Sequence, residues 1–158
     1  MENKKQISLL SALLIALATL GIGFWFGTEY KSSQNEEVLS KLSVIEEKTR
    51  DTKRLNDIKT TQIALELYYM DNGKYPIVTS PGVILGIDNY SCLDYTKGLF
   101  TDKCVNENST QIYQDPGDHK YLYISENGST YNIIFELENS VDNYSNKVLA
   151  TPNGLENK

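Results

Sequence analysis

The first pattern along the chain is a long apolar stretch near its start. The twenty residues from Ile7 to Phe26 carry no charge, and only three of them are mildly polar. A helix of that length, at about 1.5 Å per residue, covers roughly the 30 Å of a bilayer's hydrocarbon core. Trp25 and Tyr30 lie at its far end, where amphipathic rings favour the headgroup region. The pattern therefore predicts a transmembrane helix over residues 7–27.

The charges on either side of this helix predict its direction. Lys4 and Lys5 precede it, whereas Glu29 lies beyond it, and positive charge favours the cytoplasmic side. We expect residues 1–6 in the cytoplasm and the rest of the chain outside, as a single-pass protein of the cell membrane. A cleaved secretory signal is the alternative, because Ala16–Ala18 has the small-x-small form that signal peptidase reads. Cleavage there would fall inside the apolar stretch, which favours an uncleaved anchor.

Two weaker apolar seams with helical spacing follow, and residues 28–72 contain neither glycine nor proline. The first begins at Val38, repeats at intervals of four and three residues, and fades into threonine. It predicts a solvated helical stalk over residues 28–54. The second runs from Leu55 to Tyr69 and is wider, which predicts an amphipathic helix packed on a domain.

A β-hairpin is predicted in the second half of the chain. The alternating segments KYLYIS and TYNIIFEL flank Asn127-Gly128, which is a strong signal for a type I′ turn. Pairing Glu126 with Ser129 gives the hairpin one apolar face that the helix can cover, made of Leu122, Ile124, Tyr131, Ile133, Phe135 and Leu137.

The same pairing turns Tyr121 and Tyr123 away from the core. Both are therefore candidates for a partner-binding surface, unless the loop-rich residues 77–114 cover them. The segment NKVLAT predicts a third strand, and residues 151–158 read as a polar tail. Together these elements predict an α+β domain over residues 55–150, in which the long N-terminal helix, transmembrane and then amphipathic, packs on a small antiparallel β-meander.

Charge and cysteine content narrow the possible partners. Without residues 1–27 the chain has 13 basic and 20 acidic residues, a net charge of −7, from the totals of 15 and 21. Such a surface would repel the phosphates of nucleic acid, so we expect no nucleic-acid partner.

Cys92 and Cys104 are disulfide candidates if the domain lies outside the membrane. Two free thiols are the alternative.

Two segments carry a resemblance to a known family. RDTKRLNDIKTTQIALELYYMDNGKYP, residues 50–76, resembles the helix-to-loop segment of type IV pilin-like proteins and of the major pseudopilins of type II secretion. DPGDHKYLYISENGSTYNIIFELEN, residues 115–139, resembles their Asp-Pro turn and sheet. The resemblance implies a pilin-like fold and a structural or assembly subunit of a type IV pilus or type II secretion-like system. Its partners would be the membrane and other pilin-like subunits, as a homo- or hetero-oligomer.

The chain departs from this family in one respect. Members carry a prepilin-peptidase site, with a glycine, an aromatic residue at the start of the apolar helix, and a glutamate five places in. No such signature precedes Ile7, and GFWFGTE has similar letters but lies at the end of the apolar run. The alternative function is therefore a permanently anchored extracytoplasmic binding domain, such as an adhesin, sensor or accessory protein, on a pilin-like fold.

The resemblance also implies one metal candidate. Major pseudopilins bind calcium in a loop of the sheet region, and the comparable segment ELENSVDNYSNK offers Glu138 and Asp142 as oxygen donors. Solvated loop carboxylates are the alternative reading, since the segment is not a glycine- and aspartate-rich calcium loop. We expect no other cofactor.

Catalytic residues are not indicated. His119 is the only histidine and follows the turn residues Asp115 and Asp118, where aspartate commonly bonds to nearby backbone N–H groups. Neither a Gly-x-Ser-x-Gly elbow nor an activated-cysteine signature accompanies it. We therefore expect the protein not to be an enzyme.

Overall fold

The computed structural model describes residues 2–95, 99–101, 103–104 and 107–158, and the side chains of these from residue 35 onward except those of residues 99 and 101. The chain divides into two compact units, Met1–Ile45 and Glu46–Lys158. Among the residues with described side chains, no helix is long and apolar enough to cross a membrane. The span predicted over residues 7–27 lies outside them.

The only α-helix in the described part of the chain is α1, Glu2–Asn72. It ends as the sequence predicts: Gly73 has φ of 66° and its N–H donates to the Tyr69 carbonyl at 2.8 Å. The second unit starts at Glu46, ahead of the Leu55 boundary predicted for the domain. It does so because Asp51 and Arg54 are buried in it, although a pattern of apolar residues alone treats both as solvated.

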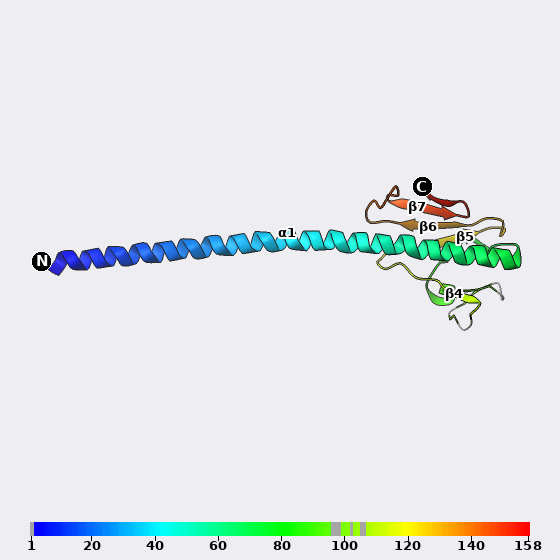
Figure 1. Ribbon diagram of the computed structural model, residues 1–158, viewed down its shortest axis with the longest axis horizontal. Helices are drawn as coiled ribbons and strands as arrows, with labels where there is room; N and C mark the ends of the chain where they lie inside the picture. The colour runs from blue at the N-terminus through cyan, green and yellow to red at the C-terminus, as the bar shows by residue number, and fades with distance from the viewer. Residues whose placement is uncertain (1, 96–98, 102, 105–106) are drawn as a thin grey trace. The chain divides into compact units, whose positions relative to one another are not determined.

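Five antiparallel strands form the main sheet, in the order β1-β5-β6-β7-β8, and Figure 1 shows α1 beside it. Its strands are β1 Val78–Ile84, β5 Leu122–Ser125, β6 Asn132–Glu136, β7 Lys147–Thr151 and β8 Gly154–Asn157. The described chain is thus α+β, with one α-helix and an antiparallel sheet, and the third strand predicted at NKVLAT is confirmed as β7. The polar tail predicted for residues 151–158 is wrong, since β8 pairs with β7 there.

A second, smaller sheet is built from the loop-rich segment. The 3-10 helix η1 leads into it, and its three short strands pair in the order β3-β2-β4. The elements are η1 Asp88–Tyr90, β2 Cys92–Asp94, β3 Leu99–Thr101 and β4 Ser109–Gln111.

The β5–β6 hairpin is present, but its register differs by one residue from the predicted one. Leu122 pairs with Ile134 and Tyr123 with Ile133, so three residues rather than two remain in the loop. Asn127 organises this loop: its Oδ1 accepts the Ser129 N–H at 3.0 Å and the Ser129 hydroxyl at 2.6 Å. Because side chains alternate along a strand, this slip exchanges the two faces of β5.

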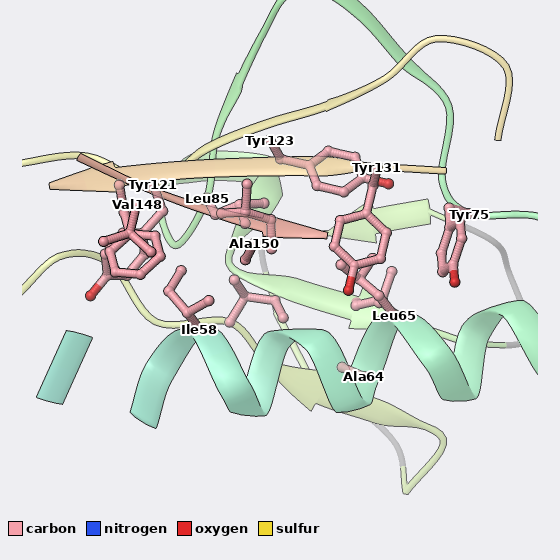
Figure 2. Close-up of a cluster of buried hydrophobic side chains, with 14 of the residues drawn as sticks. Ile58, Ala64, Leu65, Tyr75, Leu85, Tyr121, Tyr123, Tyr131, Val148 and Ala150 are labelled. Carbon is pink, nitrogen blue, oxygen red and sulfur yellow. The ribbon is translucent and has the colours of Figure 1, made fainter. Parts of the chain in front are cut away.

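The core lies between α1 and one face of the main sheet. On β6 and beside it the predicted inner residues are confirmed. On β5, Tyr123 and the preceding Tyr121 replace the predicted Leu122 and Ile124. Figure 2 shows α1 residues pointing toward the sheet and sheet residues pointing back, among them Ile58, Leu65, Tyr121, Tyr131 and Val148. Burying these side chains stabilises the unit by about 1.5–3 kcal/mol for each large aliphatic or aromatic group.

Candidate functional site

A buried cluster of charges joins α1 to two distant segments. The guanidinium of Arg54 is fully buried, and its Nη1 donates to Asp51 Oδ1 at 2.7 Å and to Glu138 Oε1 at 2.6 Å. Its Nε and Nη2 donate to the two oxygens of Asp115, at 2.7 and 2.9 Å. We call Arg50, Asp51, Arg54, Asp115 and Glu138 the Arg54 cluster.

The other members of the cluster complete its hydrogen bonds. Arg50 binds both carboxylate oxygens of Glu138. Asp51 accepts the backbone N–H of Glu138 at 2.9 Å and that of Asn139 at 2.7 Å. The Gly117 N–H also donates to Asp115, at 2.7 Å. Three carboxylates thus face two guanidinium groups and three backbone N–H groups, which compensate the cost of removing these charges from water.

The protonation of the cluster follows from these contacts. Hydrogen bonds from Arg50 and then Arg54 lower the pKa of Glu138 to about 2. Burial alone would raise the pKa of Asp115, but the hydrogen bonds from Arg54 and the Gly117 N–H outweigh it and lower that pKa. Both carboxylates are therefore ionised near neutral pH. Their oxygens are engaged as acceptors, so the cluster acts as a structural clamp and offers no free general acid or base.

Sequence reasoning missed this clamp, although a signal for it exists. Asp51 and Arg54 continue the buried stripe of the helix at intervals of three and four residues, a stripe that comprises Asp51, Arg54, Ile58, Thr61, Leu65 and Tyr68. Apolar residues alone place the start of this stripe at Leu55, one helical turn after its true start at Asp51.

The partner-surface prediction for Tyr121 and Tyr123 is wrong. The two side chains are 1% and 0% exposed, because the hairpin register turns them inward. The Tyr123 hydroxyl donates to the Pro76 carbonyl at 2.7 Å, and that of Tyr121 lies 3.4 Å from Asp57 Oδ2. Burial raises the pKa of both tyrosines.

The two calcium candidates have different surroundings. Glu138 belongs to the Arg54 cluster, whereas Asp142 is exposed, with φ of 55°, between the bridged residues Val141 and Tyr144. Within the described part of the chain, no three His, Cys, Asp or Glu side chains are grouped so as to hold a metal ion. Calcium binding stays a prediction.

Cys92 and Cys104 are joined by a disulfide, with Cα atoms 5.4 Å apart. Cys92 is buried in β2 and Cys104 is exposed, so the bond fastens the small sheet to the loop that follows β3. The pairing predicted for these cysteines is thus present in the structure.

The turn residues take up structural contacts. Asp115 accepts the Gly117 N–H at 2.7 Å, as expected for an aspartate in a turn, in addition to its bonds with Arg54. His119 Nδ1 lies 3.5 Å from Glu136 Oε2 at the surface. Asp118 is exposed.

An apolar stripe on α1 is exposed on the surface of the second unit. Ile63, Leu67 and Met70 recur at intervals of four and three residues, and Ile63 is 63% exposed. Beside the stripe lies an open groove of about 520 Å³, which we call the lateral groove. Its other side is the β7–β8 turn, and its lining comprises Lys59, Gln62, Ile63, Glu66, Leu67, Tyr131, Pro152, Asn153 and Gly154.

One buried polar group in this groove has no partner. The hydroxyl of Tyr131 makes no hydrogen bond within the described part of the chain, although the residue is 1% exposed. Figure 2 shows its ring extending from the sheet with the hydroxyl toward α1. The Gln62 amide is close enough to this hydroxyl to oppose the rise in its pKa that burial causes, but it lies outside hydrogen-bond geometry and donates to the Thr151 carbonyl at 2.9 Å.

Comparison of the chain with protein-family models, with curated proteins and with solved structures finds no match.

Proposed function

We propose that this protein is a pilin-like subunit, held in a membrane by residues 7–27, with a structural or assembly role in a type IV pilus or a type II secretion-like system. The apolar stretch anchors the subunit, and in a fibre it would form the buried centre. The domain that follows faces the extracytoplasmic side. Its surface, acidic overall, contacts other subunits rather than nucleic acid.

The observation that carries this proposal is the Arg54 cluster. The resemblance to pilin-like proteins rests on residues 50–76 and 115–139, and the cluster connects these two segments. Arg50, Asp51 and Arg54 come from the first, and Asp115 and Glu138 from the second. Two segments that resemble one family are thus packed as a single unit, in which a helix lies on an antiparallel sheet.

A permanently anchored binding domain on the same fold is the second candidate. It is favoured by the position of Gly23–Glu29, GFWFGTE, which has letters of the family's processing signature but lies at the end of the apolar stretch. Cleavage there would remove the anchor from the domain. An uncleaved chain would remain in the membrane and present the domain as a fixed receptor or accessory protein.

The test is to express the full chain, separate cell envelopes from sheared surface material, and determine the intact mass and N-terminal sequence of each pool. Under either candidate we expect at least part of the chain in the envelope, resistant to alkaline extraction. Leu14→Arg should release it, because a charge in the middle of a transmembrane helix costs about 2.5–3.5 kcal/mol. Leu39→Arg is the control, since Leu39 is exposed and lies outside the span.

The outcomes separate the two candidates. A shortened chain with a modified N-terminus in the sheared material would support a fibre subunit. An intact chain confined to the envelope would support the fixed binding domain. A chain that is soluble without cleavage would contradict both.

A further inference from the structure

We propose that the lateral groove binds the aliphatic segment of a second copy of this chain, residues 36–46. This inference rests on the proposed function and deepens it, because it names the contact by which one subunit would hold the next. Three observations carry it: an unpartnered hydroxyl in the groove, matching apolar stripes, and complementary charges.

One polar group of the groove is not satisfied by the described part of the chain. A buried hydroxyl is normally hydrogen-bonded, and leaving one unpaired is costly. Tyr131 is such a group, and its O–H needs an acceptor oxygen. Around it, Ile63 and Leu67 of α1 and Pro152 of the turn provide an apolar lining. An occupant with aliphatic side chains and nearby acceptor oxygens satisfies both demands.

The aliphatic segment has the matching shape. Its residues Val38, Leu42 and Ile45 are exposed and recur at intervals of four and three. The stripe beside the groove, Ile63 to Met70, has the same spacing. Each stripe covers eight helical residues, and its two ends lie about 10 Å apart along the axis. Two helical stripes of equal length and spacing can pack side chain between side chain.

The charges are complementary as well. Glu36 and Glu46 are exposed at the two ends of the aliphatic segment. Lys59 lies on the rim of the groove and makes no ion pair with any described residue. The one acidic residue in the lining, Glu66, already accepts the Tyr75 hydroxyl at 3.0 and 3.1 Å. An acidic helix therefore meets a cation at the groove.

Crosslinking of the full chain in detergent micelles tests the contact directly. A photoreactive amino acid replaces Leu67, and equal amounts of light and ¹⁵N-labelled protein are mixed so that intermolecular products are recognised by mass. We expect crosslinks to tryptic peptides within residues 32–48 of the other copy. The control places the same group at Ile77, an aliphatic residue 51% exposed outside the groove lining. Crosslinks to any other region, or none, would overturn the proposal.

Self-association measured by sedimentation equilibrium in the same micelles tests the chemistry. Tyr131→Phe removes only the hydroxyl, so we expect association to weaken about three- to tenfold. The free energy of unfolding of the domain should be unchanged or slightly higher, because this substitution removes no hydrogen bond within the domain. Ile63→Glu should weaken association further, whereas Ile77→Glu should not. Lys59→Glu alone should weaken self-association, and the additional substitution Glu46→Lys should partly restore it. Equal effects of the Ile63 and Ile77 variants would contradict the groove contact.

This test is separate from that of the proposed function. Membrane anchoring depends on residues 7–27, so Ile63→Glu should leave the chain in the envelope. If the protein is anchored and assembled but Ile63→Glu has no effect, the groove contact is wrong and the proposed function stands. If the uncleaved chain is soluble and monomeric, both fail.

Discussion

Arg54 and Asp115 lie 61 residues apart in the chain, and their side chains form two parallel hydrogen bonds of 2.7 and 2.9 Å with almost no exposure to water. Such a bidentate pair is geometrically specific as well as strong. It fixes the turn at residues 115–117 against α1, and with it the start of the chain that leads into β5.

Breaking this pair from one side should strongly destabilise the domain. Asp115→Ala leaves the Arg54 guanidinium buried without one of its partners, so we expect a loss of about 3–5 kcal/mol in the free energy of unfolding. Urea denaturation followed by circular dichroism measures it. Asp118→Ala in the same turn is the control, and it should change stability by less than about 0.5 kcal/mol because Asp118 is exposed. Equal effects of the two substitutions would contradict the buried pair.

Stability should fall in acid because of Glu138. Its pKa drops from about 4.5 to about 2 on folding, so the ionised form is favoured by the folded state. The resulting stability is complete above about pH 5.5 and is lost as the pH falls toward 2. Glu138→Gln should flatten the curve of unfolding free energy against pH in this window.

The buried tyrosines should resist ionisation. Burial raises the pKa of Tyr123 and Tyr131, and burial with the nearby Glu66 raises that of Tyr75 to about 12. Stability is therefore complete below pH 10 and declines as the pH rises beyond it. In a titration followed at 295 nm, only part of the tyrosine absorbance should change near pH 10 in the native protein. In urea all tyrosines should titrate together, and a single native transition near pH 10 would contradict their burial.

Two leucines two residues apart, on opposite faces of α1, provide a matched test of the core. Leu65 is fully buried and Leu67 is 43% exposed. Leu65→Ala should cost about 2–5 kcal/mol, whereas Leu67→Ala should cost much less because little cavity forms. Leu65→Asp should unfold the domain, since it would bury an unpaired charge. Thermal unfolding of the variants measures the difference, and a normal transition for Leu65→Asp would mean that the helix face is misassigned.

Removing the disulfide should affect stability moderately. The bond closes a loop of 13 residues between Cys92 and Cys104, worth about 3 kcal/mol in the chain-entropy model. The double variant Cys92→Ser, Cys104→Ser should unfold at lower urea concentration with the main sheet otherwise intact. Hydrogen exchange should then increase in β2–β4 and stay slow in β5–β7. Uniform acceleration across both sheets would show that the bond supports the whole domain instead.

The sequence predicted those elements whose signals are local. Gly73 marks the end of α1, and the apolar spacing from Leu55 to Leu65 marks its buried face, although Ile63 and Tyr69 of the same predicted seam are exposed. Alternation in TYNIIFEL identifies the inner side of β6, because polar Asn132 and Glu136 occupy the other side.

Other features depend on interactions that apolar patterns do not encode. In β5 both faces are apolar, Tyr121 and Tyr123 on one and Leu122 and Ile124 on the other, so alternation cannot choose between them. The side chain of Asn127 sets the hairpin register, because its hydrogen bonds to Ser129 stabilise a three-residue loop. The Arg54 cluster consists of charges, which composition assigns to the surface. Strand β8 contains a single large apolar residue, Leu155, and is recognisable only by its pairing with β7.

The position of the Arg54 cluster has a mechanical consequence. Tension that travels along α1 and enters the second unit at Glu46 reaches Arg50, Asp51 and Arg54 before it reaches the apolar face that starts at Leu55. The cluster passes this force to the turn at residues 115–117 and to the end of β6 at the same time, so no single strand is peeled away from its neighbours. The domain should therefore resist pulling along its helix better than its modest core would suggest.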